Sequence, residues 1–123
     1  MKEIKLTDSE KSLMEILWEK KRIFMKDILD SYPEPKPAAT TIATLLKRMQ
    51  NKDLVGYKLY GNSREYYPKV EKGEYFNEEM TSMIDRFFNS SVTQFASFFT
   101  SNAKFSQKQL KELRDIIDEK IKE

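Results

Sequence analysis

The chain of 123 residues contains no cysteine and no histidine, and it has only three glycines and four prolines. Without cysteine and histidine there is no disulfide framework, no thiol nucleophile, no ordinary zinc finger and no histidine-based catalytic triad. A metal site would depend on carboxylate and carbonyl oxygens. No apolar run of about 18 residues indicates a membrane span, and no secretion signal is visible. By default we therefore expect a soluble intracellular protein that has no cofactor and does not insert into a membrane.

An excess of one charge sign is also lacking, since 22 lysines and arginines are matched by 20 aspartates and glutamates. Averaged over the chain, the net charge of +2 gives no support to a polyanionic partner. The charges are segregated, however. Residues 1–35 carry a net −1, residues 36–69 carry +5 and residues 70–123 carry −2. The positive charge is therefore concentrated in the middle of the chain.

The first 35 residues have helical periodicity with clear start and stop signals. Thr7 and Glu10 have the spacing of a capping box, and residues 13–18 form an apolar stripe, which predicts a helix. Residues 25–32 repeat apolar side chains at helical spacing, so a second, shorter helix is expected before the prolines that follow. The last of these prolines, Pro37, suits the first position of a third helix.

The third helix separates its two sides most clearly. Apolar residues recur at i, i+3, i+4 and i+7 between Ile42 and Met49, which defines a buried side. The other side presents hydroxyl and basic side chains: Thr40, Thr41, Thr44, Lys47 and Arg48. Threonine is a poor helix former, so these threonines indicate a role beyond helix formation.

Between Val55 and Val70 the periodicity changes from helical to alternating. Two β-rich runs flank the turn residues Gly61 and Asn62, which predicts a hairpin. Three helices followed by a hairpin are the elements of a winged helix-turn-helix. We expect this domain to span residues 1–70 of a mainly α chain.

Residues 71–123 are expected to form a separate helical domain with three helical segments, the last opened by a capping box at Ser106 and Gln109. This segment holds seven of the eight phenylalanines. Aromatic residues at helical spacing are typical of a core rather than a ligand pocket, but so short a segment has little interior. A second copy would cover the surplus, so we expect a homodimer. The expected dimerisation residues are Phe76, Met80, Met83, Phe87, Phe95, Phe99, Leu113 and Ile117.

The positive segment coincides with the third helix and the hairpin, the two elements with which a winged helix faces DNA. A helix fits the major groove, where threonine can contact phosphates and bases and basic residues can neutralise phosphates. We expect double-stranded DNA as the partner, contacted by Thr40, Thr41, Thr44, Lys47, Arg48, Lys58 and Arg64. The alternative is a winged helix that binds another protein and no DNA. No spacing of carboxylates, nucleophiles and glycines supports an enzyme.

Several stretches carry a family resemblance in their order and spacing. They are Leu6–Trp18 (LTDSEKSLMEILW), Thr41–Val55 (TIATLLKRMQNKDLV), the hairpin through Tyr67, and Leu110–Ile117 (LKELRDII). Over nearly its whole length the chain resembles the penicillinase repressor family of bacterial transcriptional regulators (BlaI/MecI/CopY type). The resemblance implies a cytoplasmic, homodimeric repressor that places its winged helix on a palindromic operator.

In relatives, a membrane sensor of β-lactams triggers proteolysis within the dimerisation segment. The matching cleavage position here is Phe98 and Phe99, where relatives cut by that route carry asparagine followed by phenylalanine. The inducing signal stays open between cleavage involving a membrane sensor protease, a ligand between the C-terminal helices, and no inducer. The copper-responsive branch has C-terminal cysteines, so copper sensing is excluded. A glycine common before the first wing strand is Asp53 here, which predicts a slightly different turn.

Overall fold

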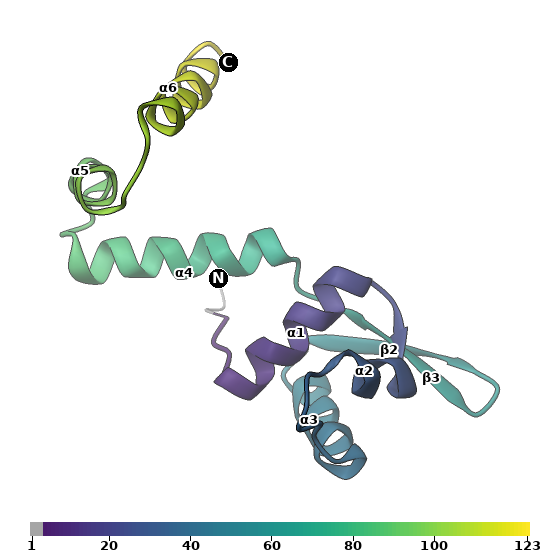
Figure 1. The fold of residues 1–123 in the computed structure, drawn as a ribbon. Helices are drawn as coiled ribbons and strands as arrows, with labels where there is room; N and C mark the ends of the chain where they lie inside the picture. The colour runs from purple at the N-terminus through teal and green to yellow at the C-terminus, as the bar shows by residue number, and fades with distance from the viewer. Residues whose placement is uncertain (1–3) are drawn as a thin grey trace. The chain divides into compact units, whose positions relative to one another are not determined.

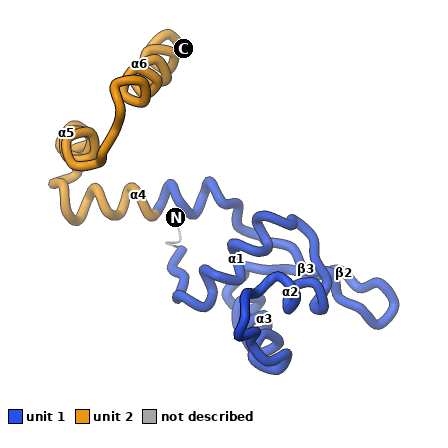
Figure 2. The backbone as a smooth tube through the Cα atoms, viewed as in Figure 1, with its two compact units in different colours: residues 1–78 blue, residues 79–123 orange. Residues whose placement is uncertain are grey.

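The computed structural model describes residues 4–123 and confirms a mainly α fold with a small antiparallel sheet (Figure 1). Within those residues the elements are α1 (Asp8–Lys20), β1 (Ile23–Phe24), α2 (Met25–Ser31), α3 (Ala39–Asn51), β2 (Val55–Tyr60), β3 (Ser63–Pro68), α4 (Lys72–Phe87), α5 (Val92–Asn102) and α6 (Gln107–Ile121). The chain forms two compact units, residues 1–78 and 79–123, and the division falls within α4 (Figure 2).

The start of α1 is the capping box that the sequence predicts. The Thr7 hydroxyl accepts a hydrogen bond from the Glu10 backbone N–H at 3.2 Å, and the Thr7 N–H donates to Glu10 Oε1 at 2.9 Å. Each contact satisfies a backbone or side-chain group that the helix itself leaves without a partner. Glu10 is therefore held in a fixed place at the first turn of α1.

The helix α2 ends at Ser31, before the prolines, as expected from the sequence. Lys36 stabilises this end, because its ammonium donates to the backbone carbonyls of Leu29, Asp30 and Tyr32 at 2.9–3.4 Å. A cation at a helix C-terminus complements the partial negative charge of the last carbonyls.

The prediction that Pro37 occupies the first position of the third helix is wrong. The helix α3 begins two residues later, at Ala39, with Ala38 as its N-cap. The cap residue needs an extended backbone, and Ala38 supplies it with φ −69° and ψ 147°. Pro37 therefore belongs to the connection before the helix.

The predicted hairpin is confirmed and belongs to a three-stranded sheet with the order β1-β3-β2. The strands β2 and β3 pair in antiparallel register from Val55 opposite Pro68 to Tyr60 opposite Ser63. The turn uses Gly61 with φ +61°, a left-handed conformation that glycine adopts without strain. The edge strand β1 was not predicted, because a two-residue strand has no periodicity to recognise.

The core lies in the first unit and unites the apolar sides of α1, α2 and α3 with the sheet. This confirms the buried sides read from the sequence. Its buried residues are Leu13, Met14, Leu17, Ile23, Ile28, Ile42, Leu45, Leu46, Met49, Leu54, Val55 and Tyr66.

The start of α4 packs on α1 within the first unit. The Trp18 indole N–H donates to the Val70 carbonyl at 2.8 Å, and the Trp18 ring lies 5.7 Å from that of the fully buried Tyr75. These contacts fix the end of the hairpin and the beginning of α4 against α1.

The three predicted helical segments are α4, α5 and α6, and the second unit contains the end of α4 together with α5 and α6. Ser106 forms the predicted capping box of α6 with Gln109, and Ser91 caps α5. Phenylalanine rings pack against one another here, with centroid distances of 5.5 Å between Phe88 and Phe95 and 5.7 Å between Phe95 and Phe99. Nevertheless, none of the residues in α5 and α6, all of which the structure describes, is buried.

Candidate nucleic-acid interface

The helix α3 exposes the hydroxyl and basic side that the sequence singled out. Thr40, Thr41, Thr44, Lys47 and Arg48 are all exposed. Ile42, Leu45, Leu46 and Met49 are buried on the opposite side. Because four buried side chains anchor the helix in the core, its exposed side chains start from a fixed backbone.

A hollow of about 410 Å³ lies along the exposed side of α3. Its lining residues are Ser9, Thr40, Thr41, Thr44, Leu45 and Arg48. The Thr44 hydroxyl donates to the Thr40 carbonyl at 3.0 Å, so its oxygen remains able to accept. Ser9 was not predicted, because it belongs to α1 and no pattern in the sequence connects it to α3. The structure thus brings three of the predicted threonines together with Arg48.

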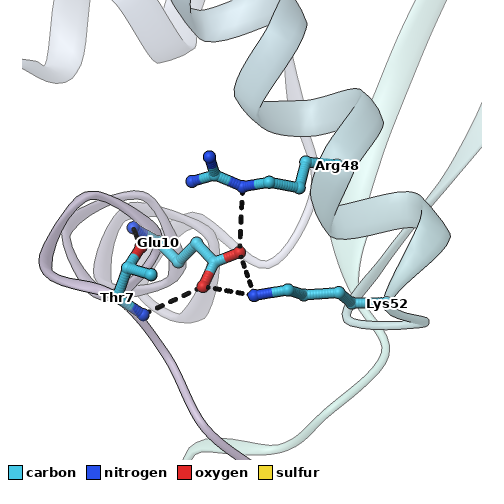
Figure 3. A network of polar contacts seen from close by, with 4 residues as sticks. All are labelled: Thr7, Glu10, Arg48 and Lys52. Atoms are coloured by element: carbon cyan, nitrogen blue, oxygen red, sulfur yellow. Dashed lines mark hydrogen bonds and ion pairs between the residues drawn. The ribbon is translucent and has the colours of Figure 1, made fainter.

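The carboxylate of Glu10 lies beneath the basic end of α3 and is wholly buried. Lys52 Nζ donates to Glu10 Oε2 at 2.8 Å and to Oε1 at 3.0 Å, and Arg48 Nε donates to Oε2 at 3.4 Å (Figure 3). The Thr7 N–H provides a further bond to Oε1. A basic residue predicted to contact DNA is therefore also a partner of an acidic group in α1.

These contacts change the acidity of Glu10. Burial is the largest single influence and would raise its pKa, but the hydrogen bonds from Lys52 and Thr7 and the charge of Lys52 together lower the pKa below its ordinary value. The sequence indicated Glu10 only as a capping residue, because its partners lie 38 and 42 positions further along the chain.

The predicted hairpin cations, Lys58 and Arg64, are both exposed but lie on opposite faces of the hairpin. This follows from the register, in which Lys58 is opposite Glu65 while Arg64 is opposite Leu59. The Arg64 guanidinium lies 4.3 Å from the centre of the Tyr57 ring, and the Lys58 ammonium lies 5.3 Å from that of Tyr60. Each cation therefore rests on an aromatic ring.

The turn before β2 contains a second acidic group beside a basic one. Asp53 has φ +64°, the left-handed conformation, which glycine adopts freely and aspartate tolerates. Its carboxylate accepts a hydrogen bond from the Lys69 ammonium. This bond and the charge of Asp53 raise the pKa of Lys69. Lys69 is thus less available to a phosphate than Lys58 is.

The predicted dimerisation residues form a largely exposed apolar set. Phe76, Met80, Met83, Phe87, Phe99 and Ile117 are exposed, whereas Phe95 and Leu113 are half-buried. Phe87 is 69% exposed. Ile116, which was not among the predicted dimerisation residues, is exposed as well.

The predicted cleavage residues Phe98 and Phe99 both lie within α5 and are exposed.

Among the helices of the described chain, none combines the length and apolar character needed to span a bilayer. Within residues 4–123, no three acidic side chains gather closely enough to hold a metal ion.

Comparison with known proteins gives a consistent result. A family model described as penicillinase repressor matches residues 6–119. A penicillinase repressor of Bacillus licheniformis is 24% identical, over 97% of this chain and 94% of its own. The methicillin resistance regulatory protein MecI of Staphylococcus epidermidis is 24% identical over 97% and 98%, and a penicillinase repressor of Staphylococcus aureus is 21% identical over 96% and 94%.

Proposed function

Because this chain belongs to the penicillinase repressor family of transcriptional regulators, we propose that it represses transcription by binding a palindromic operator in double-stranded DNA as a homodimer. The relatives that it matches are named as repressors, and they align with it over nearly the full length of both chains.

The observation that carries the DNA-binding part is the exposed side of α3. It presents hydroxyl and basic side chains within the segment of net charge +5, and its buried side is fixed in the core. A helix of this kind fits the major groove, with its N-terminal threonines directed to base edges and its basic residues to phosphates. The hairpin adds Lys58 and Arg64, which suit the phosphates beside the groove or the minor groove.

The dimeric part rests on the exposed large apolar side chains of α4, α5 and α6. Monomeric soluble proteins rarely expose so many large apolar residues in one segment of chain. A twofold-symmetric interface would bury the same residues of both copies. It would also present two α3 helices to the two half-sites of a palindrome.

The test is a selection from a library of random DNA duplexes with the purified full-length chain. We expect an enriched palindromic sequence, bound at least about a thousand-fold more tightly than a scrambled duplex at physiological salt. Equal affinity for both duplexes across a salt series would contradict sequence-specific repression. No measurable binding to either duplex would favour the alternative of a winged helix that binds protein and no DNA.

Proteolysis within α5 is the route by which we propose that repression is relieved, with a membrane sensor protease as the partner. A protease needs an extended substrate, so α5 must unfold locally. The residues of α5, all described, include none that is buried, which keeps the cost of that unfolding low. Cleavage between Phe98 and Phe99 would separate α6 from the DNA-binding unit.

The cleavage is tested in cells that carry the chain and its neighbouring genes. After exposure to a β-lactam, mass spectrometry should detect a fragment that ends at Phe98. Derepression while the chain remains intact would contradict cleavage and leave DNA binding and dimerisation unaffected.

A further inference from the structure

The buried carboxylate of Glu10 is an unusual feature beneath a DNA-binding surface, because an acidic group there repels phosphates. Its capping role in α1 does not require this arrangement, since glutamine serves equally well at that position of a capping box. What glutamine cannot supply is the charge that holds Lys52 and Arg48. Arg48 belongs to the last turn of α3, and Lys52 is the C-cap residue that follows the helix.

Lys52 and Arg48 contact the Glu10 carboxylate at different distances and therefore have different roles. Lys52 contacts both oxygens of Glu10, at 2.8 and 3.0 Å, and thereby matches its charge. Arg48 makes one longer contact of 3.4 Å through Nε, and its side chain remains 51% exposed. The three groups together keep one net positive charge, and it lies with Arg48, the member that lines the hollow beside the threonines.

The orientation of Arg48 follows from the use of Nε. Figure 3 shows its two terminal nitrogens pointing away from the Glu10 carboxylate. These terminal nitrogens are the donors with which arginine makes bidentate contacts to guanine or phosphate. An arginine that is held through Nε before it meets DNA loses less conformational freedom on binding.

We propose that Glu10 is a positioning residue for DNA recognition, which holds Arg48 through Nε so that its terminal nitrogens remain free for the operator. Lys52 is the counter-ion that allows the carboxylate to do so without cancelling the charge of Arg48. This inference rests on the DNA binding proposed above.

The variant that tests the proposal is Glu10→Gln, which keeps an acceptor for the Thr7 N–H and removes the charge. We expect affinity for the selected operator to fall about ten-fold, a coupling typical of residues in contact. Affinity for a scrambled duplex should stay the same or rise, because the variant carries one more positive charge. A residue that serves only the fold would lower both affinities together, and that result would overturn the proposal.

A double-mutant cycle identifies the residue through which Glu10 acts. In an Arg48→Met background, Glu10→Gln should cause no further loss of operator affinity. An equal loss in both backgrounds would mean that Glu10 acts elsewhere, contrary to the proposal. The matched control is Glu15→Gln, which removes an exposed carboxylate from α1 and should leave both duplex affinities within two-fold.

A measurement on the free wild-type chain needs neither DNA nor a variant. The heteronuclear NOE of the Arg48 Nε–H group should match that of the α3 backbone, whereas exposed Arg114 should be mobile. An Arg48 as mobile as Arg114 would overturn the proposal even if the chain binds its operator. Conversely, a chain that does not distinguish operator from random DNA would disprove the proposed function while Arg48 stayed ordered.

Discussion

At the scale of single residues, Glu10 illustrates how a buried charge is tolerated. Moving a carboxylate out of water is costly unless it is paired and hydrogen-bonded. Here Lys52, Arg48 and the Thr7 N–H supply the partners. Within the described residues, no buried side-chain nitrogen or oxygen lacks a hydrogen-bond partner. The stability of the first unit should therefore depend on the protonation of this group.

The pH dependence follows from the lowered pKa of Glu10. Its stabilising contribution is present above the ordinary value of 4.5 and is lost as the pH falls through the lower value in the folded chain. We expect Glu10→Gln to reduce the difference in urea midpoint between pH 7 and about pH 3. The exposed Glu15→Gln should preserve that difference. An undiminished difference in Glu10→Gln would show that other groups govern acid sensitivity.

Gly56 provides a test of packing in the sheet. A Cβ atom at this position would lie 2.7 Å from Cζ and from the hydroxyl oxygen of Tyr67, so the Tyr67 ring would have to shift to make room. We expect Gly56→Ala to destabilise the chain by about 1–3 kcal/mol in urea unfolding. Gly73→Ala is the control, since no atom lies within 4 Å of its added Cβ, and it should be neutral or slightly stabilising. Equal stabilities of the two variants would contradict the predicted clash.

At the scale of elements, α3 and the hairpin should contribute differently to binding. We expect Thr44→Val on α3 to lower operator affinity by about 1 kcal/mol while affinity for random DNA is unchanged. The substitution removes the hydroxyl that we propose to contact base edges. Titration of both duplexes at one salt concentration measures the two effects. Parallel losses on the two duplexes would place Thr44 outside base recognition.

The hairpin is expected to act through charge alone. Lys58→Ala should weaken binding to all duplexes to a similar degree and flatten the slope of log affinity against log salt by about one. Lys69→Ala should have a smaller effect, because Asp53 already binds the Lys69 ammonium. A loss confined to the operator would indicate that Lys58 contacts bases.

Most elements were predictable because their signals are local. The capping boxes at Thr7 and Ser106 and the alternation within the hairpin lie within a few residues of chain. The strand β1 was missed because its pairing of Ile23 with Tyr66 joins positions far apart in the sequence. For the same reason the sequence revealed neither the contact of Glu10 with α3 nor the place of Ser9 in the hollow.

At the scale of the whole molecule, assembly and DNA binding should be linked. Phe87 is largely exposed, so Phe87→Asp should leave the fold intact but abolish the dimer, and operator affinity should fall with it because a single half-site binds weakly. Sedimentation and operator titration test this together. Thr93→Asp introduces the same charge at an exposed polar position of α5 and should change neither. A wild-type chain that is monomeric at micromolar concentration would refute the dimer.

The exposed phenylalanines should also influence the level of the protein in the cell. A newly made copy without a partner presents Phe87, Phe98 and Phe99 to chaperones and degrading proteases, which recognise such apolar side chains. If the chain forms the proposed homodimer, lone copies should therefore be removed faster than assembled ones. Because pairing depends on the square of the concentration, the amount of intact protein should rise more steeply than its rate of synthesis. Halving the gene dosage should then lower the protein level by more than half.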